Sequence, residues 1–575
     1  MSEHSTAHHF LEGLCEIGVE YLFCNLGTDH VPIIEELARW KKAGRNHPAV
    51  LLCGHENLAM HMAMGYALLT GKGQAVLVHV DVGVANAVMG MHNACRTRVP
   101  LLLFAGKAPF TVRGELPGSR DTFVNFLQEP FDMAGMVRPF AKWTYDLPAG
   151  LVVREALTRA HAVMQSDPQG PVLMTAAREV LMSPQPDEKM RSFPPERQGP
   201  IQAAGLDDGA VRKLAAMILA AKNPVLISSY AGRNPKAPAL VDALARLAGM
   251  RVYESNAIHL NIPRDSPCFA GFLAGPELGD ADFGLLVDVD TPWVPKFAKI
   301  DPQARWAVLD VDPLKSGMPN WGYPADLRLM ADSVPVLERL IALLQAEAPE
   351  AWKRAAAERL AALAQRRQGL REAAKKAAAD PGKKGAMSVS YVAAELNKVL
   401  GPDDILVHET ITNVFQVMAQ IERTRPLSVL ANGGGGLGFG GGVALGAKLA
   451  KPDRLVVHLT GDGSFVFSNP SAMMIAAKRY GLPILTIVLD NGGWGAVKGA
   501  TLRSFPEGTA KAMGEFQAVL GEGIRHEALA AMVDGHGECV EDPAEIAVAL
   551  GRGIAAVKAG KPAVVVFRIE RIDQT

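Results

Sequence analysis

The sequence predicts an α/β protein of three domains, each with a mostly parallel sheet flanked by helices. Short apolar runs alternate with longer amphipathic or alanine-rich segments along the whole chain, which is the pattern of parallel-sheet domains. The length of 575 residues exceeds what a single hydrophobic core usually serves. Two charged stretches, residues 183–200 with prolines and residues 347–384 with alanines, divide the chain.

These two charged stretches set the expected domain boundaries. In the first third, strands are expected at residues 75–80, 101–105 and 172–175, and helices after Glu56 and over residues 151–165. The stretch 347–384 is predicted to form a solvated helix followed by a loop. The predicted domains are residues 1–182, 201–345 and 387–575.

Composition argues against several classes of partner. The net charge is -1, from 59 basic and 60 acidic residues, so no bulk attraction to nucleic acid or to an anionic membrane is expected. The six cysteines are scattered without zinc-ligand spacing, which favours a reducing, cytoplasmic setting. The uncharged stretch 427–446 contains nine glycines and is predicted to be a loop feeding an element, not a membrane span.

An acidic residue between two glycines follows one apolar run. Asp462 comes three residues after the end of the predicted strand at 455–459, and a second predicted strand, 483–489, ends at Asp490 and Asn491. Because parallel strands present their carboxyl ends at one edge of a sheet, Asp462 and Asn491 are expected to lie close together. A carboxylate, an amide oxygen and a backbone carbonyl suit Mg²⁺ when phosphate oxygens and water complete its shell. The surrounding glycines, and a helix expected to start near Asn469, favour a diphosphate there.

A second glycine run offers a rival reading. Gly433, Gly435 and Gly438 match G-x-G-x-x-G, which would make the chain a nicotinamide-dependent oxidoreductase. That reading leaves the Asn491 turn and Glu56 without a role.

The sequence GDGS at 461–464, followed about thirty residues later by an Asn-Gly turn, resembles the motif of thiamine-diphosphate-dependent enzymes. The resemblance implies that Mg²⁺ is bound by Asp462, Asn491 and the carbonyl of Gly493. The family's motif usually ends in Asn-Asn, and this chain has Asp490 at the position that is not a ligand. The cofactor contacts that the resemblance implies in this chain are at Thr412, Gly435, Leu437, Gly461, Asp462, Gly463, Ser464, Asn491, Gly493 and Trp494.

The resemblance extends to the first domain. The segment from Glu56 to Ala67 is similar to the helix that opens with the family's catalytic glutamate, so Glu56 is implied as the acid beside N1′ of the aminopyrimidine. The segment from Val78 to Ala94 resembles the part of benzoylformate decarboxylases that carries an active-site histidine, which makes His79 a candidate proton donor or acceptor. The alternative for Glu56 is a purely structural role, as a negative charge at the N-terminal end of a helix dipole. The alternative for His79 is a histidine that packs in the core.

Three further residues are candidate substrate contacts. Thr28 falls where those decarboxylases have a serine near the substrate carboxylate. Asp81 replaces a small residue of relatives, and Lys107 replaces a glutamine usual in acetolactate synthases. Asp81 and Lys107 are expected either to pair with each other or to mark an unusual substrate. Ile411 stands where a phosphate-binding hydroxyl residue is common.

The resemblance covers nearly the whole chain and is of the acetolactate synthase and benzoylformate decarboxylase type. It implies a thiamine-diphosphate-binding fold with a Rossmann-like central domain. It also implies a carbon-carbon lyase or ligase that decarboxylates a small 2-oxo acid and releases an aldehyde or joins a second carbonyl compound. The active site is expected between subunits of a homodimer or homotetramer. Acetolactate synthases carry FAD in the central domain; residues 232–235 are a weak signal, so an FAD-free protein is favoured. A non-catalytic thiamine-diphosphate binder is the remaining alternative.

Overall fold

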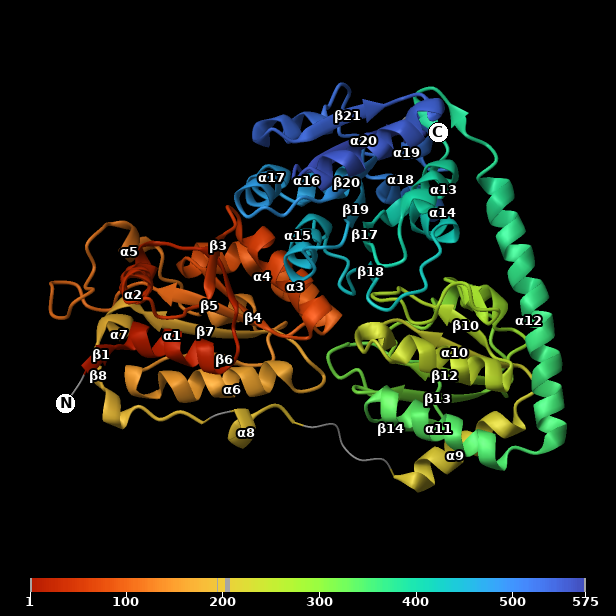
Figure 1. The fold of residues 1–575 in the computed structure, drawn as a ribbon, viewed down its shortest axis with the longest axis horizontal. Helices are drawn as coiled ribbons and strands as arrows, with labels where there is room; N and C mark the ends of the chain where they lie inside the picture. The colour runs from red at the N-terminus through yellow and green to blue at the C-terminus, as the bar shows by residue number, and fades with distance from the viewer. Residues whose placement is uncertain (1–2, 194, 202–206, 573–575) are drawn as a thin grey trace.

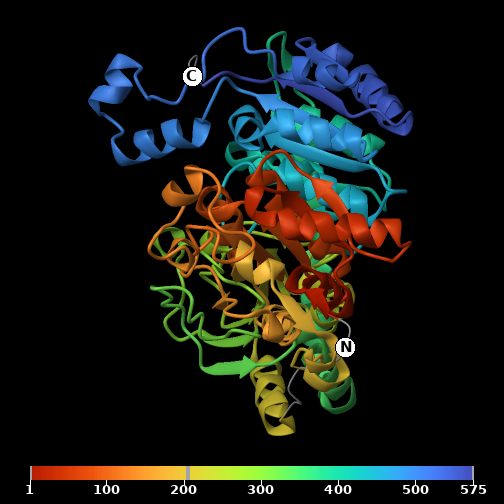
Figure 2. The same cartoon turned by 90° about the vertical axis from the view of Figure 1, so that its left-hand side faces the viewer.

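The computed structural model describes residues 3–193, 195–201 and 207–572. Three six-stranded sheets with parallel neighbours form the centres of three domains, as the alternation of apolar runs and helices predicts. In Figure 1 the N-terminal and central domains lie side by side below the C-terminal domain. Figure 2 shows the same three-part arrangement from the side.

The N-terminal domain has the strand order β3-β2-β4-β5-β7-β6. The strands predicted at 75–80, 101–105 and 172–175 are confirmed as β4, β5 and β7, and the helix predicted after Glu56 is α3. The strands are β2 (Tyr21–Asn25), β3 (Ala49–Leu52), β4 (Gln74–Val78), β5 (Leu101–Lys107), β6 (Thr144–Asp146) and β7 (Val172–Ala177). The helices are α1 (Thr6–Glu16), α2 (Val31–Lys42), α3 (Glu56–Thr70), α4 (Val80–Thr97), α5 (Val124–Leu127), α6 (Val153–Gln165) and α7 (Arg178–Met182).

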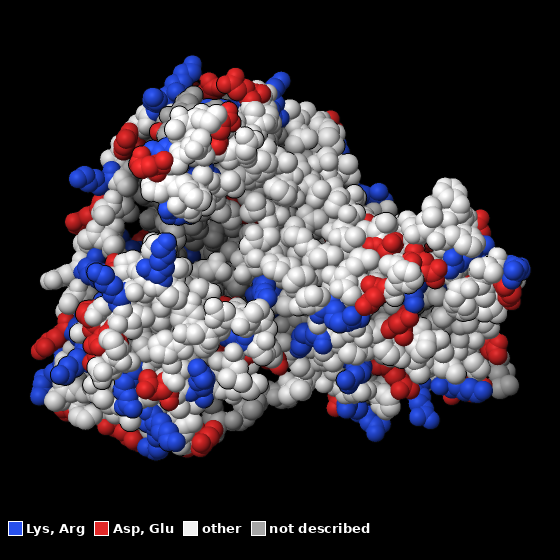
Figure 3. All heavy atoms as spheres, turned by 180° about the vertical axis from the view of Figure 1, so that it is seen from behind, with Lys and Arg blue, Asp and Glu red and all other residues white. Residues whose placement is uncertain are grey.

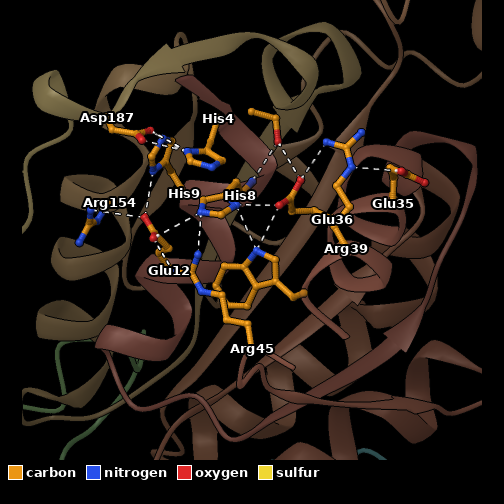
Figure 4. Close-up of polar contacts among 12 residues, drawn as sticks. His4, His8, His9, Glu12, Glu35, Glu36, Arg39, Arg45, Arg154 and Asp187 are labelled. Carbon is orange, nitrogen blue, oxygen red and sulfur yellow. Dashed lines mark hydrogen bonds and ion pairs between the residues drawn. The ribbon is translucent and has the colours of Figure 1, made fainter. Parts of the chain in front are cut away.

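The connector after this domain is partly ordered against it. Strand β8 (Pro184–Pro186) pairs antiparallel with β1 (Glu3–Ser5), and a short helix, α8 (Pro195–Gln198), follows. A polar cluster fixes the same corner (Figure 4): His4 Nδ1 lies 2.9 Å from an oxygen of Asp187, and His8 Nδ1 lies 2.6 Å from an oxygen of Glu36. Glu12 pairs with His8 and with Arg154 of α6, and so joins this cluster to α6. The chain start, α2 and the connector are thus held together by ion pairs.

The central domain has the order β11-β10-β9-β12-β13-β14. Its strands are β9 (Pro224–Ser228), β10 (Arg251–Glu254), β11 (Phe269–Gly271), β12 (Phe283–Val287), β13 (Arg305–Asp310) and β14 (Leu327–Met330), and its helices are α9 (Asp208–Ala220), α10 (Ala237–Ala248) and α11 (Ser333–Glu347). The solvated helix predicted in 347–384 is confirmed as α12 (Glu350–Ala377), which buries few side chains and runs along one side of the molecule to the C-terminal domain (Figure 1).

The C-terminal domain follows a small hairpin and has the order β18-β17-β19-β20-β22-β21. Its strands are β15 (Gly382–Lys383) and β16 (Ala386–Met387) in the hairpin, then β17 (Ile405–Glu409), β18 (Val429–Leu430), β19 (Val456–Gly461), β20 (Leu485–Asp490), β21 (His536–Val540) and β22 (Ala563–Arg568). Its helices are α13 (Val389–Val399), α14 (Val414–Gln420), α15 (Gly440–Ala450), α16 (Asp462–Phe467), α17 (Pro470–Arg479), α18 (Gly495–Ser504), α19 (Thr509–Met513) and α20 (Ile546–Lys558).

Glycines join the N-terminal and C-terminal domains through α3 and α15, which lie against each other (Figure 1). A Cβ on Gly65 of α3 would lie 2.1 Å from the carbonyl oxygen of Val443, and one on Gly446 would lie 2.0 Å from that of Met62. A side chain at either position would force the helices apart. The glycine run therefore also serves helix packing, and α15 begins at Gly440, within the stretch that was predicted to be a loop.

The helix expected near Asn469 is observed as α17, which begins one residue later. A shorter helix, α16, begins earlier, at Asp462 itself. In the part of the chain that the structure describes, no helix is both long and apolar enough to span a bilayer. All six cysteines are free thiols. Basic and acidic side chains are interspersed on the face seen in Figure 3, in keeping with the small net charge.

Candidate active site

The residues predicted to hold the cofactor's diphosphate meet at one edge of the C-terminal sheet. They lie at the ends of four neighbouring strands: Thr412 follows β17, Gly435 and Leu437 follow β18, Gly461 ends β19 and is followed by Asp462 to Ser464, and Asn491 to Trp494 follow β20. Thr412 and Asn491 line one cavity. Strand order alone brings these sequence-distant residues together, because ligands of parallel sheets bind at the carboxyl ends of the strands.

Asp462 is the buried acidic centre of this edge. Its side chain is 2% exposed, and its Oδ2 has no hydrogen-bond partner among the described residues. Burial and then the charge of Asp490 raise its pKa to about 7. A buried carboxylate oxygen without a partner is costly unless a cation or donor meets it. This oxygen therefore fits a divalent cation.

Asp490, the departure from Asn-Asn, lies next to that carboxylate. Atoms of Asp462, Asp490 and His526 that can bind a metal lie within 4.8 Å of one another. Asp490 Oδ1 accepts the N–H of Gly492 at 3.0 Å, and its other oxygen accepts from Arg568. Both oxygens of Asp490 already have partners, whereas Oδ2 of Asp462 has none. This difference favours Asp462 as the metal ligand of the pair.

The backbone around these groups is open for phosphate. A Cβ on Gly461 or Gly435 would meet nothing within 4 Å, so their backbones face free space. Gly493 has a φ of 152° and a Cβ there would lie 2.0 Å from the Ala518 carbonyl oxygen, so only glycine fits. A Cβ on Gly463 would lie 2.6 Å from the indole of Trp494. The open glycines and the free Asp462 oxygen fit a diphosphate held by a divalent cation.

Two residues that were not predicted from the sequence hold the glycine loop that carries Gly435 and Leu437. Glu409, at the end of β17, is 1% exposed and accepts the N–H groups of Gly438 at 2.6 Å and Gly440 at 2.8 Å. Burial raises its pKa to about 8, although these N–H groups oppose the shift. Asn93 of α4 exchanges two 3.1 Å hydrogen bonds with the backbone of Gly436. An acid directly after an apolar strand is the one signal that could have singled out Glu409.

The first-domain candidates occupy the equivalent edge of their own sheet. Thr28 follows β2, Glu56 opens α3 after β3, His79 and Asp81 follow β4, and Lys107 ends β5. A carboxylate oxygen of Glu56 accepts from the side-chain amide of Asn86 at 3.0 Å. The Glu56 side chain is 13% exposed. It is the first residue of α3.

His79 has a carboxylate partner that the sequence analysis did not name. Its Nδ1 lies 2.6 Å from Oδ1 of Asp29, the residue directly after Thr28. The hydrogen bond to Asp29 raises the pKa of His79. Burial alone would raise the pKa of Asp29, but hydrogen bonds from His30 and His79 outweigh it and hold that pKa well below its usual range. Asp29 thus fixes the ring of His79 and favours its protonated form.

Asp81 and Lys107 do not pair with each other. Lys107 Nζ donates to Asp146 at 2.6 Å, and Asp81 Oδ1 accepts the N–H of Val82 at 2.9 Å. The structural alternative of an Asp81–Lys107 pair is therefore wrong.

The two groups of predicted residues stay apart within one chain. Among the described residues, no hydrogen bond joins Thr28, Glu56, His79, Asp81 or Lys107 to the predicted residues of the C-terminal edge. The neighbours of Glu56 do share a cavity of about 470 Å³ with Leu437; its lining includes His55, Asn57, Asn86 and Phe467.

A larger cavity lies between the central and C-terminal domains. Its volume is about 720 Å³, and the glycine loop from Gly433 to Leu437 forms one wall. Residues 254–257, 272–276, 291–294 and 297 of the central domain form the other side. Figure 3 shows the surface hollowed between these two domains.

A buried polar network lies at the carboxyl ends of the central strands. Tyr230 and Lys315 are each 1% exposed at the carboxyl ends of the central strands, and both donate to Asp310, at 2.6 and 2.5 Å. Arg98 enters from α4 and makes two 2.8 Å hydrogen bonds with Asp290. This network links the first two domains.

Two family models match the two parts of the chain that contain the sheet edges described above. The family model described as "Thiamine pyrophosphate enzyme, N-terminal TPP binding domain" matches residues 4–136, and the one described as "Thiamine pyrophosphate enzyme, C-terminal TPP binding domain" matches residues 411–567. Together the two matches cover just over half of the chain.

Curated relatives align over most of the chain. An acetolactate synthase from Mycobacterium bovis is 25% identical over 512 residues, which are 86% of this chain and 77% of that protein. A benzoylformate decarboxylase from Pseudomonas aeruginosa is 24% identical over 508 residues, 86% of this chain and 87% of the relative. The structure of a thiamine diphosphate-dependent 4-hydroxybenzoylformate decarboxylase from Rhodococcus jostii RHA1 superposes with a TM-score of 0.79 at 22% identity, over all of both chains, and shows the shared fold. The chain belongs to the thiamine pyrophosphate enzyme family.

Proposed function

We propose that this chain is a thiamine-diphosphate- and Mg²⁺-dependent enzyme that decarboxylates a 2-oxo acid and then releases an aldehyde or forms a new carbon-carbon bond. The observation that carries the proposal is the C-terminal edge, where one carboxylate oxygen of Asp462 has no partner among the described residues and the neighbouring Gly461 has open space beside its backbone. The bound cofactor would supply the electron sink for loss of CO₂.

The protein's own groups have separable tasks in this proposal. Asp462, Asn491 and the Gly493 carbonyl would bind Mg²⁺, and Thr412, Gly461, Gly463 and Ser464 would contact the diphosphate. Gly435, Leu437 and Trp494 would orient the cofactor rings. Glu56 would hold a proton at N1′ of the aminopyrimidine, and its position as the first residue of α3 supports that role.

The first domain would supply the residues that contact the substrate. His79 would move a proton to or from the substrate, and its hydrogen bond to Asp29 fixes the ring for that task. Thr28 would contact the substrate carboxylate. Asp81 and Lys107 would be further substrate contacts; Asp81 has no ion pair with Lys107, and Lys107 would have to exchange its partner Asp146 for the substrate.

The structure gives the rival glycine-run reading less support. A Cβ on Gly433 would lie 2.6 Å from the carbonyl oxygen of Arg96, and one on Gly438 would lie 2.2 Å from that of Phe467. Close packing thus accounts for two of the three matched glycines without a nicotinamide dinucleotide.

We also propose a homodimer or homotetramer with active sites between subunits, in a reducing cytoplasmic setting. Two observations support this. Within one chain the candidate residues of the first domain make no hydrogen bond to those of the last, and the six cysteines are free thiols. The mass in solution, measured by light scattering, tests the assembly; a monomer that is fully active would contradict it.

The decisive experiment compares the protein with its Glu56→Gln variant. Both receive thiamine diphosphate and Mg²⁺, then pyruvate, 2-oxobutanoate or benzoylformate, and CO₂ and carbonyl products are followed. We expect CO₂ release to fall by about 10²-fold or more in the variant, as for loss of a general acid. Glu350→Gln, on exposed α12, is the matched control. Tight cofactor binding without CO₂ from any substrate would instead indicate a non-catalytic binder.

A further inference from the structure

A histidine that none of the expected cofactor contacts uses lies beside the buried acids Asp462 and Asp490. One ring nitrogen of His526 and one oxygen of each carboxylate all lie within 4.8 Å of one another. His526 is 4% exposed, and the two acids are 2% and 3% exposed. Two carboxylates and an imidazole that converge in the interior form a ligand set for a cation.

The ring of His526 has a packing partner but no polar partner. It contacts Phe465 of α16 edge-on, with ring centroids 5.8 Å apart, so the start of α16 fixes its position. No hydrogen bond or ion pair between described residues involves a ring nitrogen of His526; the nearest ion pair joins its neighbours Arg525 and Glu527. A nitrogen that faces two acids and bonds to neither is free to bind a cation that both acids attract.

The charges around the three groups favour a cation. Arg568 donates to Asp490 and to the carbonyl oxygen of Ile524, the latter at 3.2 Å, so it offsets one carboxylate and holds the segment that leads into His526. Oδ2 of Asp462 has no partner among the described residues. With both acids ionised, Asp462, Asp490 and Arg568 together carry one net negative charge. Such a charge is costly in the interior unless a cation meets it.

The nitrogen decides which cation these ligands suit. Mg²⁺ is a hard ion that takes oxygen ligands, whereas divalent first-row transition ions such as Mn²⁺ and Co²⁺ bind imidazole as well as carboxylate. We propose that His526 joins Asp462 in holding the divalent cation, so that this site prefers a transition ion to Mg²⁺. Asp490 stabilises the ion through its charge while its oxygens keep Gly492 and Arg568. This inference rests on the proposed function, because the same Asp462 would hold the cation of the cofactor.

The test compares the affinities of Co²⁺ and Mg²⁺ for the metal-free protein with thiamine diphosphate present, measured by calorimetry. Co²⁺ should bind about tenfold or more tightly than Mg²⁺. His526→Phe keeps a ring to pack against Phe465 but offers no nitrogen. It should lower the Co²⁺ affinity about tenfold or more, the scale on which even a change outside the ligand shell acts, and leave the Mg²⁺ affinity nearly unchanged. His526→Gln is the second variant if His526→Phe does not fold.

The matched control is His536→Phe in the same domain. One ring nitrogen of His536 lies 2.8 Å from Glu538, and this histidine belongs to no group of converging ligands among the described residues. The control should leave both affinities as they are in the unmodified protein.

Spectroscopy reports the nitrogen ligand without any turnover. In protein loaded with Mn²⁺, pulsed electron paramagnetic resonance should show coupling of the ion to a histidine nitrogen nucleus. The coupling should be lost in His526→Phe and kept in His536→Phe.

The outcomes separate this inference from the proposed function. Equal Co²⁺ affinity in His526→Phe and in the unmodified protein, with no nitrogen coupling, overturns the inference and assigns the histidine to packing against Phe465; CO₂ release with Mg²⁺ would then leave the proposed function standing. Co²⁺ binding that depends on His526, without CO₂ from any 2-oxo acid, supports the inference and overturns the proposed function. Nitrogen coupling that disappears in His536→Phe instead would place the ion elsewhere and overturn the inference.

Discussion

Glu409 accepts the backbone N–H of Gly438 at 2.6 Å, which ties the end of β17 to the loop that is expected to hold the aminopyrimidine. The second carboxylate oxygen holds Gly440 at 2.8 Å, so one side chain sets both ends of a turn that has few side chains of its own. Glycine-rich backbone loses much conformational freedom on ordering, and a fixed acceptor reduces the number of states it can occupy.

We predict that Glu409→Gln weakens thiamine diphosphate binding about tenfold, which corresponds to about 1.4 kcal/mol. The amide nitrogen of Gln cannot accept a hydrogen bond, so one of the two loop N–H groups loses its acceptor while remaining buried. The dissociation constant measured by titrating the apoprotein checks this. Glu507→Gln, on an exposed side chain, should bind like the unmodified protein. Equal affinity in Glu409→Gln would show that the loop does not need this anchor.

We predict that Asp462→Asn removes the Mg²⁺ dependence of cofactor binding. A neutral amide in place of the only partnerless carboxylate oxygen of the Asp462–Asp490 pair gives up the charge that attracts the cation. Asp490→Asn restores the Asn-Asn ending common in the family and should retain Mg²⁺-dependent binding, because Asp490 serves Arg568 and Gly492. Calorimetric titration of both variants with and without Mg²⁺ decides. Loss of the Mg²⁺ effect in Asp490→Asn alone would assign the metal to Asp490.

We predict that Gly446→Ala lowers the melting temperature of the protein. The new Cβ would lie 2.0 Å from the Met62 carbonyl oxygen, and such overpacking costs about 1–3 kcal/mol. Gly369→Ala on α12 is the control, since a Cβ there meets nothing within 4 Å. That change should stabilise the helix by about 0.5–1 kcal/mol through backbone entropy. Thermal unfolding followed by circular dichroism measures both, and an unchanged transition in Gly446→Ala would mean that α3 and α15 separate without cost.

We predict that Asp29→Asn lowers the pKa of His79. The hydrogen bond and charge of Asp29 are what raise it, and the amide supplies neither the charge nor the same acceptor strength. The limb of the pH dependence of kcat/KM that reports His79 should therefore move to lower pH. Asp146→Asn, which removes only the partner of Lys107, serves as the comparison. An unmoved limb in Asp29→Asn would exclude His79 as the group that titrates.

We predict that the polar cluster of Figure 4 stabilises the protein above the ordinary range of carboxyl titration. Burial raises the pKa of Glu12, but hydrogen bonds from His9 and Arg45 outweigh it and lower the pKa from 4.5 to about 2. A depressed carboxyl pKa means that the unfolded state binds the proton first, so the stabilisation is present above pH 4.5 and is lost as the pH falls to about 2.

Glu12→Gln should accordingly lower the melting temperature by a few degrees at neutral pH and by progressively less in acid. Melting curves between pH 7 and the lowest pH at which the protein stays folded test this. Glu35→Gln, whose side chain is 64% exposed in its pair with Arg39, should show little difference at any pH. A Glu12→Gln effect that does not shrink toward low pH would have to come from packing.

The local sequence pattern was enough to predict the helices and strands whose structure depends mainly on their own residues. The runs at 101–105 and 172–175 are long enough and apolar enough to indicate buried strands. The charged, alanine-rich stretch before Asp380 indicates a solvated helix. The Gly-Asp-Gly and Asn-Gly sequences each follow an apolar run, so their position at a strand end could also be predicted from the local sequence.

What the sequence by itself determined is therefore the α/β class, the family, and the residues at the carboxyl edges of two sheets. The tertiary structure alone decided which groups hold those residues. Asp29 lies fifty positions from His79, Asn93 lies more than three hundred positions from Gly436, and the cavity of about 720 Å³ is lined by segments of two domains. A hydrogen bond or a cavity wall depends on distance in space, and periodicity along the chain carries no record of which distant segments the fold brings into contact.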